Sequence, residues 1–170
     1  YDVYTRVYDK NGVAQTNEFL VHPASTDLQW YPSIVLDQDG NFIISWHNRT
    51  VGMSSDDDIY FQRFEGDGTK IGSAVQVNTY TAGIQAFSNI GIDAKGNFIV
   101  AWWSNLQDDS STGVYAQRYD ADGVKIGGEF QVHSSTSLEQ SYPTVAVEPD
   151  GDFMIAWNSE HLSGTDEVFD

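Results

Sequence analysis

The sequence has 170 residues, of which 40% are hydrophobic, and this suits a single folded domain with a substantial core. Asp and Glu number 25 against 8 Lys and Arg, so the net charge is −17 at pH 7. Such an acidic surface repels polyanions and excludes nucleic acid as a partner, and the longest apolar run, 98–103, is too short for insertion into a membrane.

Two short motifs alternate along the chain, and each occurs three times. The first motif, with the short strand that follows it, reads VYTRVYDKNG then EFLVH from Val3, IYFQRFEGDG then AVQVN from Ile59, and VYAQRYDADG then EFQVH from Val114. The second motif reads LDQDGNFIISW from Leu36, IDAKGNFIVAW from Ile92 and VEPDGDFMIAW from Val147. Self-similarity at a fixed period is typical of repeat folds.

Each repeat contains four predicted strands, here termed A to D, as in 32–37, 41–48, 59–64 and 73–78. Strand A is continuously apolar, which predicts a strand covered on both faces, whereas strand B places Phe42, Ile44 and Trp46 on one face. We therefore predict an all-β fold of β-propeller blades, in three four-stranded antiparallel repeats of about 55 residues. The single repeat domain, 1–170, divides into strands C and D of one blade (1–35), two full repeats (36–91 and 92–146), and strands A and B with the start of C (147–170).

All six predicted hairpins share an acidic residue three positions before a glycine, as in Asp37 with Gly40 and Asp93 with Gly96. In a type I turn, Asp accepts hydrogen bonds from backbone amides, and Gly adopts the positive φ that follows. These acids are therefore predicted to be structural.

Three blades are too few to close a propeller, which usually has four to eight. The sequence leaves three explanations open: the chain is part of a longer tandem array, two copies form a homodimer that closes a six-bladed ring, or the repeats form an open solenoid.

The repeat pattern, best seen in VYAQRYDADGVKIGGEFQVH from Val114 to His133, resembles the tandem propeller-type repeats of large secreted bacterial proteins with hemolysin-type (RTX-like) calcium-binding or cadherin-like adhesin segments. The resemblance implies an extracellular or cell-surface location, a role in adhesion or surface scaffolding, and a calcium-rich setting. It implies no catalytic residues.

Acidic residues gather in the loops between strands B and C of every copy. The predicted calcium ligands are Asp56, Asp57, Asp58, Asp108, Asp109, Asp166 and Glu167. Calcium takes six to eight oxygen ligands, which such loops can supply. The alternative is a solvated loop whose charge only maintains solubility.

A glutamine followed two residues later by an aromatic residue recurs before each strand A. The predicted ligand-binding residues are Gln29, Trp30, Tyr31, Gln85, Phe87, Gln140 and Tyr142. An amide beside a ring suits sugars, which accept hydrogen bonds and stack on aromatic faces. The alternative places the rings in the core, with the amides bonded to neighbouring backbone groups.

The leading functional hypothesis is an extracellular, calcium-stabilised scaffolding module that binds a cell-surface ligand. A multivalent carbohydrate-binding propeller is the alternative, and a glycan-active enzyme fragment is the third hypothesis. Because no nucleophile elbow and no zinc constellation occurs, the sequence predicts that the chain is not an enzyme.

Overall fold

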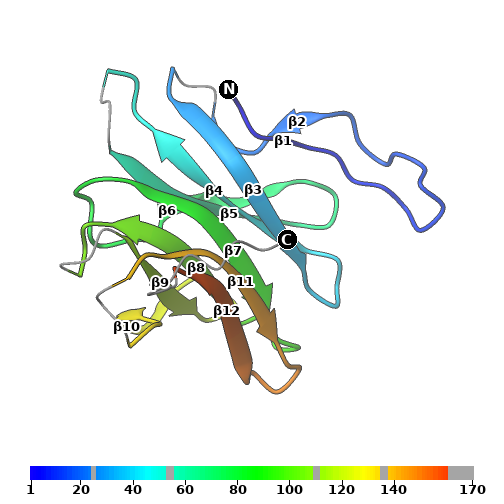
Figure 1. Ribbon diagram of the computed structural model, residues 1–170. Helices are drawn as coiled ribbons and strands as arrows, with labels where there is room; N and C mark the ends of the chain where they lie inside the picture. The colour runs from blue at the N-terminus through cyan, green and yellow to red at the C-terminus, as the bar shows by residue number, and fades with distance from the viewer. Residues whose placement is uncertain (24–25, 53–55, 109–111, 135–137, 161–170) are drawn as a thin grey trace, which may run out of the picture.

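A computed structural model describes residues 1–23, 26–52, 56–108, 112–134 and 138–160 (Figure 1). Over these residues the chain forms strands and no helix, so none of its described segments is a helix able to cross a membrane. The strands are β1 (Tyr4–Thr5), β2 (Phe19–Leu20), β3 (Leu28–Leu36), β4 (Phe42–Arg49), β5 (Asp57–Phe64), β6 (Lys70–Gln76), β7 (Gln85–Ile92), β8 (Phe98–Asn105), β9 (Thr112–Tyr119), β10 (Lys125–Gln131), β11 (Gln140–Val147) and β12 (Phe153–Ser159).

The strands form four antiparallel sheets in which neighbours in sequence are also neighbours in space. Two sheets are complete, with the orders β3-β4-β5-β6 and β7-β8-β9-β10, and two contain one pair each, β1-β2 and β11-β12. The sheets follow one another as layers, and the β1-β2 pair lies at the opposite end from β11-β12 (Figure 1). The predicted all-β fold with four-stranded antiparallel units is therefore confirmed.

The hairpin turns form as their acidic residues predict. The Asp37 carboxylate accepts hydrogen bonds from the backbone N–H groups of Asp39 and Asn41, both at 2.9 Å, and Gly40 has a φ of 86°. Asp93 accepts equivalent bonds from Lys95 and Asn97. These carboxylates therefore make their hydrogen bonds within the turns and stabilise them.

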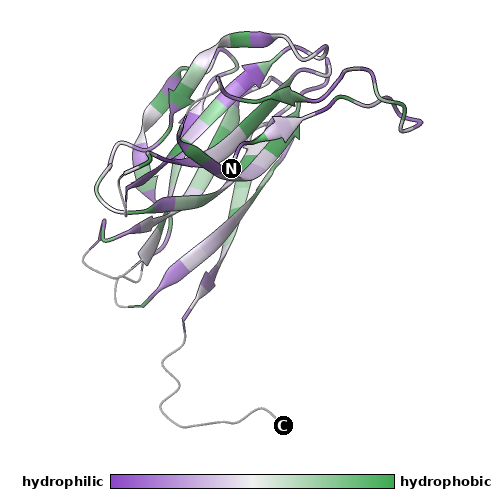
Figure 2. Ribbon diagram, turned by 90° about the horizontal axis from the view of Figure 1, so that it is seen from above, coloured by the Kyte–Doolittle hydropathy of each residue, from purple (hydrophilic) through white to green (hydrophobic). Residues whose placement is uncertain are grey.

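The core lies between the layers. Trp102 and Val100 of β8 are completely buried against Phe61 and Ile59 of the preceding sheet. Trp46 of β4 is equally enclosed, in a cluster that reaches Val3 beside β1. Hydrophobic segments follow the packed strands in Figure 2. The predicted inward face of strand B is thus confirmed in both complete sheets.

The first strand of each complete sheet begins earlier than predicted. β3 begins at Leu28 and β7 at Gln85, because each continues backwards across a β-bulge, between Trp30 and Ser33 in β3 and between Ala86 and Asn89 in β7. Residues that we expected in loops therefore lie within strands.

The prediction that strand A is covered on both faces is wrong for β3. Its Ile34 and Leu36 side chains are 51% and 61% exposed, whereas the equivalent Ile90 of β7 is buried. The reason is positional, since β7 lies between two first strands, β3 and β11, and β3 has such a neighbour on one side only.

Candidate functional site

Three aromatic residues at equivalent places in three sheets have left-handed backbones. Tyr31, Phe87 and Tyr142 have φ values of 50°, 53° and 52°. A bulky side chain in this region costs roughly 1–2 kcal/mol. The same strain is therefore built three times at one repeat position.

These residues form a continuous row of rings, which we call the ring row. The ring centroids of Tyr31 and Phe87 are 4.7 Å apart, and those of Phe87 and Tyr142 are also 4.7 Å apart. Tyr31 and Tyr142 are nevertheless more than half exposed. The bulges turn these rings out of the strands. The strained backbone therefore places aromatic side chains at the surface.

The ring row borders a pocket of about 350 Å³ between the two complete sheets. The residues that line the pocket are Trp30, Tyr31, His47, Arg49, Asp57, Ile84, Ala86, Phe87 and Trp103. The lining is aromatic with a few polar groups, which is the usual composition of a small-molecule site. Rings and polar atoms therefore converge on one place.

His47 supplies a neutral polar group to this pocket. Burial lowers the pKa of its imidazole to about 4, with the nearby Arg49 also lowering it and Asp57 opposing the shift. Its side chain is 4% exposed, yet Nδ1 has no hydrogen-bond partner in the described part of the chain. A buried polar atom of this kind is normally satisfied, so the unpartnered Nδ1 is an unusual feature of the pocket wall.

An ion pair closes one side of the pocket. The Arg49 guanidinium donates two hydrogen bonds to the Asp57 carboxylate, at 2.5 and 2.8 Å, and it lies 5.1 Å from the centroid of the Trp30 ring. Asp57 is buried, and its hydrogen bonds raise the pKa of Arg49. The paired charges hold Trp30 and Arg49 in fixed positions.

The shifted pKa of His47 predicts a pH-dependent contribution to stability. The unfolded imidazole takes up a proton near pH 6.5 and the folded one only near 4, so its contribution is complete above 6.5 and is lost as the pH falls towards 4. Relative to His47→Asn, which introduces the side chain that the repeat has at Asn158, the natural chain should lose roughly 2–3 kcal/mol of unfolding free energy between pH 7 and 4.5. Urea denaturation of both proteins at the two pH values measures this difference, and equal losses would contradict the prediction.

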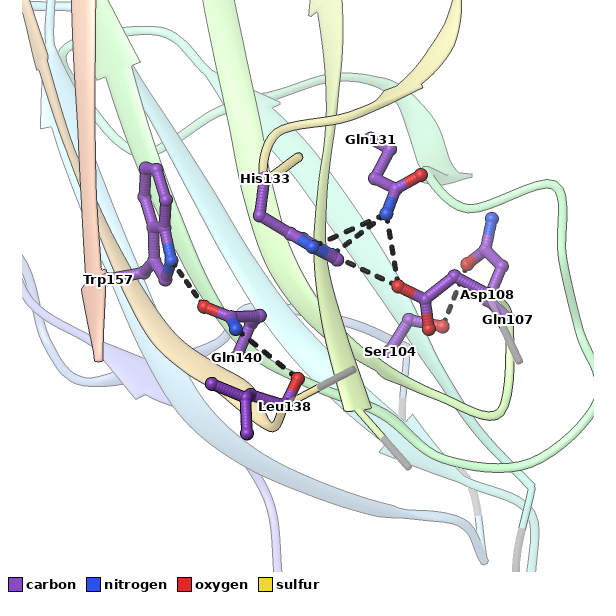
Figure 3. Close-up of polar contacts among 8 residues, drawn as sticks. All are labelled: Ser104, Gln107, Asp108, Gln131, His133, Leu138, Gln140 and Trp157. Carbon is purple, nitrogen blue, oxygen red and sulfur yellow. Dashed lines mark hydrogen bonds and ion pairs between the residues drawn. The ribbon is translucent and has the colours of Figure 1, made fainter. Parts of the chain in front are cut away.

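The structure separates the predicted glutamines from their aromatic neighbours. Gln29, Gln85 and Gln140 are at most 2% exposed. The Gln29 amide donates to Asn48 Oδ1 at 2.7 Å, and the Gln140 carbonyl accepts a bond from Trp157 Nε1 at 2.7 Å (Figure 3). These amides fasten the starts of the first strands, because buried polar groups need internal partners. They are therefore left out of the candidate site, whereas Trp30 and the ring row remain in it.

The described acidic residues do not converge as a calcium site requires. Asp57 bonds to Arg49, Asp58 accepts a bond from Asn78 Nδ2 at 2.6 Å, and Asp108 lies 3.2 Å from His133 Nε2. Burial raises the pKa of Asp58. Asp56 is half-buried, and within the described residues no three His, Cys, Asp or Glu side chains form a group that could hold a metal ion. Asp109, Asp166 and Glu167 lie outside the described residues.

An acidic residue contacts the last residue of the fourth-strand motif in all three repeats, but in the third repeat the acid comes from a different position. Asp58 bonds to Asn78, and Asp2 lies 3.7 Å from His22 at the equivalent place. The third copy has Gly113 where these acids stand, and there Asp108 reaches His133 from the preceding loop (Figure 3). A Cβ atom on Gly113 would lie 2.9 Å from Asp108 Oδ2. The glycine therefore makes room for the replacement carboxylate.

Comparison with known proteins gives matches at the level of structure. No protein-family model and no curated protein matches the chain. An endo-arabinase from Bacteroides thetaiotaomicron matches with a TM-score of 0.54 at 18% identity, over 79% of this chain and 52% of that one. An alpha-L-arabinofuranosidase from Lactobacillus brevis matches with a TM-score of 0.53 at 12% identity, over 95% of this chain and 60% of that one. The chain thus spans between half and three fifths of the lengths of these two structures.

These matches show a shared fold and correct one prediction. Both structures are named as enzymes, whereas we predicted from the sequence that the chain is not an enzyme. That prediction relied on the absence of a local catalytic motif. The two matched structures overturn it, because they are enzymes with the same fold, and the absence of a local motif does not exclude this function.

Proposed function

We propose that this chain is part of a glycan-acting β-propeller of the glycoside hydrolase type, in which the pocket and the ring row bind the glycan. The observation that carries the proposal is the ring row, with three strained backbones at equivalent positions and exposed rings at Tyr31 and Tyr142. Strain that recurs in this way is typical of functional positions. The enzymes that share the fold support the choice of a glycan over other ligands.

The chemistry of the pocket suits a sugar. Tyr31, Phe87 and Trp30 offer aromatic faces to the C–H faces of pyranose or furanose rings. Neutral His47 adds a further ring to the lining, and Arg49 adds N–H donors beside Trp30. Successive rings along the row then contact successive sugar residues, which favours a chain over a monosaccharide.

Hydrolysis of a glycosidic bond normally requires two carboxyl groups, one as acid and one as base or nucleophile. Among the described residues that line the pocket, Asp57 is the one carboxylate, and Arg49 holds it. We therefore assign glycan binding to this pocket, and we place the cleavage chemistry elsewhere in the propeller of which this chain is a part. The adhesion hypothesis has no comparable support, and an extracellular location stays a prediction.

The first test measures glycan binding with and without the exposed rings. We expect the chain to bind soluble arabinan in calorimetry, and Tyr31→Asn and Tyr142→Asn each to weaken binding about 10-fold or more, as loss of a stacked ring does. Asn tolerates the left-handed backbone, so unfolding free energy should change by no more than about 1 kcal/mol. This separates lost binding from lost folding.

Leu106 provides a matched control for these variants. It is also exposed and has a φ of 64°, but it does not line the pocket. Leu106→Asn should leave binding unchanged. Absence of binding to arabinan and to a panel of other neutral polysaccharides, or an equal loss in the Leu106→Asn protein, would refute the proposed function. Release of reducing sugar from arabinan, measured in parallel, tests whether this chain itself supplies the cleavage chemistry.

A further inference from the structure

The junction between the second complete sheet and the β11-β12 pair repeats the junction that holds the pocket. β7 packs against β3, β4 and β5, and β11 packs in the same way against β7, β8 and β9. The Ile90 N–H donates to Ser33 Oγ at 3.4 Å across the first junction, and the Val145 N–H donates to Asn89 Oδ1 at 2.8 Å across the second. The ring row continues from one junction to the next through Phe87. The second junction therefore places its residues as the first one does.

Glu139 occupies the place at the second junction that Ile84 occupies in the pocket. The Asn105 N–H donates to the Ile84 carbonyl oxygen at 2.9 Å, and the Glu160 N–H donates to the Glu139 carbonyl oxygen at 2.9 Å. Gln140, directly after Glu139, is fixed by the hydrogen bond that it accepts from β12 (Figure 3). Because Ile84 lines the pocket, a carboxylate takes the corresponding position on the path of the ring row.

The two junctions differ in charge and polarity. In the pocket, Arg49 at the end of β4 is paired with Asp57 at the start of β5, so the two charges cancel. The corresponding pair at the second junction consists of the neutral residues Asn105 and Thr112. The polar residues at the second junction that correspond to pocket-lining residues are Asn105, Thr112, Glu139, Ser141 and Asn158. They offer hydroxyl and amide groups and one carboxylate, with no cation among them.

We propose that the second junction is a further glycan subsite on the ring row, and that Glu139 makes it selective for neutral sugars over sugars that carry a carboxylate or a sulfate. This subsite rests on the proposed function, because it binds the next part of the same glycan. Sugar hydroxyl groups donate hydrogen bonds to a carboxylate, and bonds to a charged acceptor are stronger than those between neutral groups. Glu139 then holds the sugar that contacts the rings of Phe87 and Tyr142.

Charge at the second junction opposes the binding of an anionic sugar. Glu139 repels a carboxylate or sulfate group, and Asn105 supplies no positive charge at the position that Arg49 has in the pocket. The net charge of −17 adds a long-range repulsion of polyanions. Because the net charge acts from the whole chain and Glu139 acts locally, substitution of Glu139 separates the two effects.

Calorimetry of the chain with arabinan and with polygalacturonate, both at low salt, tests the selectivity. We expect the natural chain to bind arabinan and to show no measurable binding of polygalacturonate. Glu139→Gln should weaken arabinan binding about 10-fold, because it removes a charged acceptor. Glu139→Lys should also weaken arabinan binding, but it should bind polygalacturonate measurably, with an affinity that falls as salt is added. Misfolding does not create affinity for a new ligand, so this gain identifies a direct role.

Glu148 provides the matched control, because it follows the other end of β11 and corresponds to no residue of the pocket lining. Glu148→Gln and Glu148→Lys change the net charge by the same amounts as the two Glu139 variants. Both affinities should stay within about 2-fold of those of the natural chain. Urea denaturation of all four variants shows whether each one is folded.

The results that overturn the subsite differ from those that overturn the proposed function. If Tyr31→Asn weakens arabinan binding but Glu139→Gln leaves it unchanged, the glycan site stands and the second subsite is wrong. Polygalacturonate binding by the natural chain as tight as arabinan binding, or no gain of it in Glu139→Lys, refutes the selectivity. Equal effects of the Glu148 variants would assign the changes to net charge and remove the role of Glu139. Absence of binding to any glycan overturns the proposed function, and the subsite with it.

Discussion

Placing a side chain on Gly91 is expected to loosen the last pair of strands from the rest of the protein. A Cβ atom on Gly91 would lie 2.5 Å from Val147 Cγ2 and 2.9 Å from Val145 Cγ1, and both valines belong to β11. Valine side chains have few alternative rotamers, so they cannot move aside easily. We expect Gly91→Ala to cost about 1–3 kcal/mol of unfolding free energy, and Gly91→Val to cost more.

Two further variants make this test specific. Gly128→Ala is the control, because a Cβ there would meet no atom within 4 Å and its cost should stay within about 0.5 kcal/mol. Val147→Ala in the Gly91→Ala background removes the clashing methyl and should recover part of the loss. Urea denaturation gives the free energies, and hydrogen exchange shows whether β11 and β12 lose protection first. If Gly91→Ala were as stable as the natural chain, the packing described between β7 and β11 would be incorrect.

Moving the acidic residue beside His133 from position 108 to position 113 is expected to change the unfolding free energy in a strongly non-additive way. Asp108→Ala removes the carboxylate 3.2 Å from His133 Nε2 and should cost about 2 kcal/mol. Gly113→Asp should cost about 3 kcal/mol, because a Cβ there lies 2.6 Å from the same nitrogen and a second carboxylate meets Asp108.

The double variant restores the arrangement of the other two repeats, in which the acid stands at the position of Gly113, as with Asp2 and Asp58. The contact between a Cβ at position 113 and His133 Nε2 remains in the double variant, but the repulsion between two carboxylates is gone and His133 has an acidic partner again. We therefore expect its loss of stability to be well below the sum of the two single losses, which makes the coupling energy favourable. Thermal and urea unfolding of the four proteins complete the cycle. Additive losses would mean that the two acids do not replace one another.

Much of the fold could be predicted from the sequence because turns and strand faces depend on local chemistry. The acid and glycine of each hairpin predicted turns that Asp37 and Gly40 form. The alternation in Phe42, Ile44 and Trp46 predicted a buried face, and all three are at most 4% exposed. Which first strands would be covered depended on the number of neighbouring layers, which no local pattern contains.

The candidate site was harder to predict, because its geometry depends on backbone conformations that aromatic residues rarely adopt. The recurrence of Tyr31, Phe87 and Tyr142 was visible in the sequence, but their positive φ values were not. His47 was missed because its repeat equivalents are Trp103 and Asn158, which gave no sign of a shared role. Its importance comes from burial beside Arg49 and Asp57, and this needs the sheets in place.

The pairing of every strand with its neighbour in sequence also has a kinetic consequence. Each complete sheet closes within about 50 consecutive residues, Leu28–Gln76 in one case and Gln85–Gln131 in the other. The connections between paired strands are short, so closing them costs little chain entropy. The protein should therefore fold faster than a β-sandwich of equal length, in which paired strands come from distant parts of the chain. Either complete sheet can nucleate first, with the end pairs joining last by stacking onto a formed neighbour.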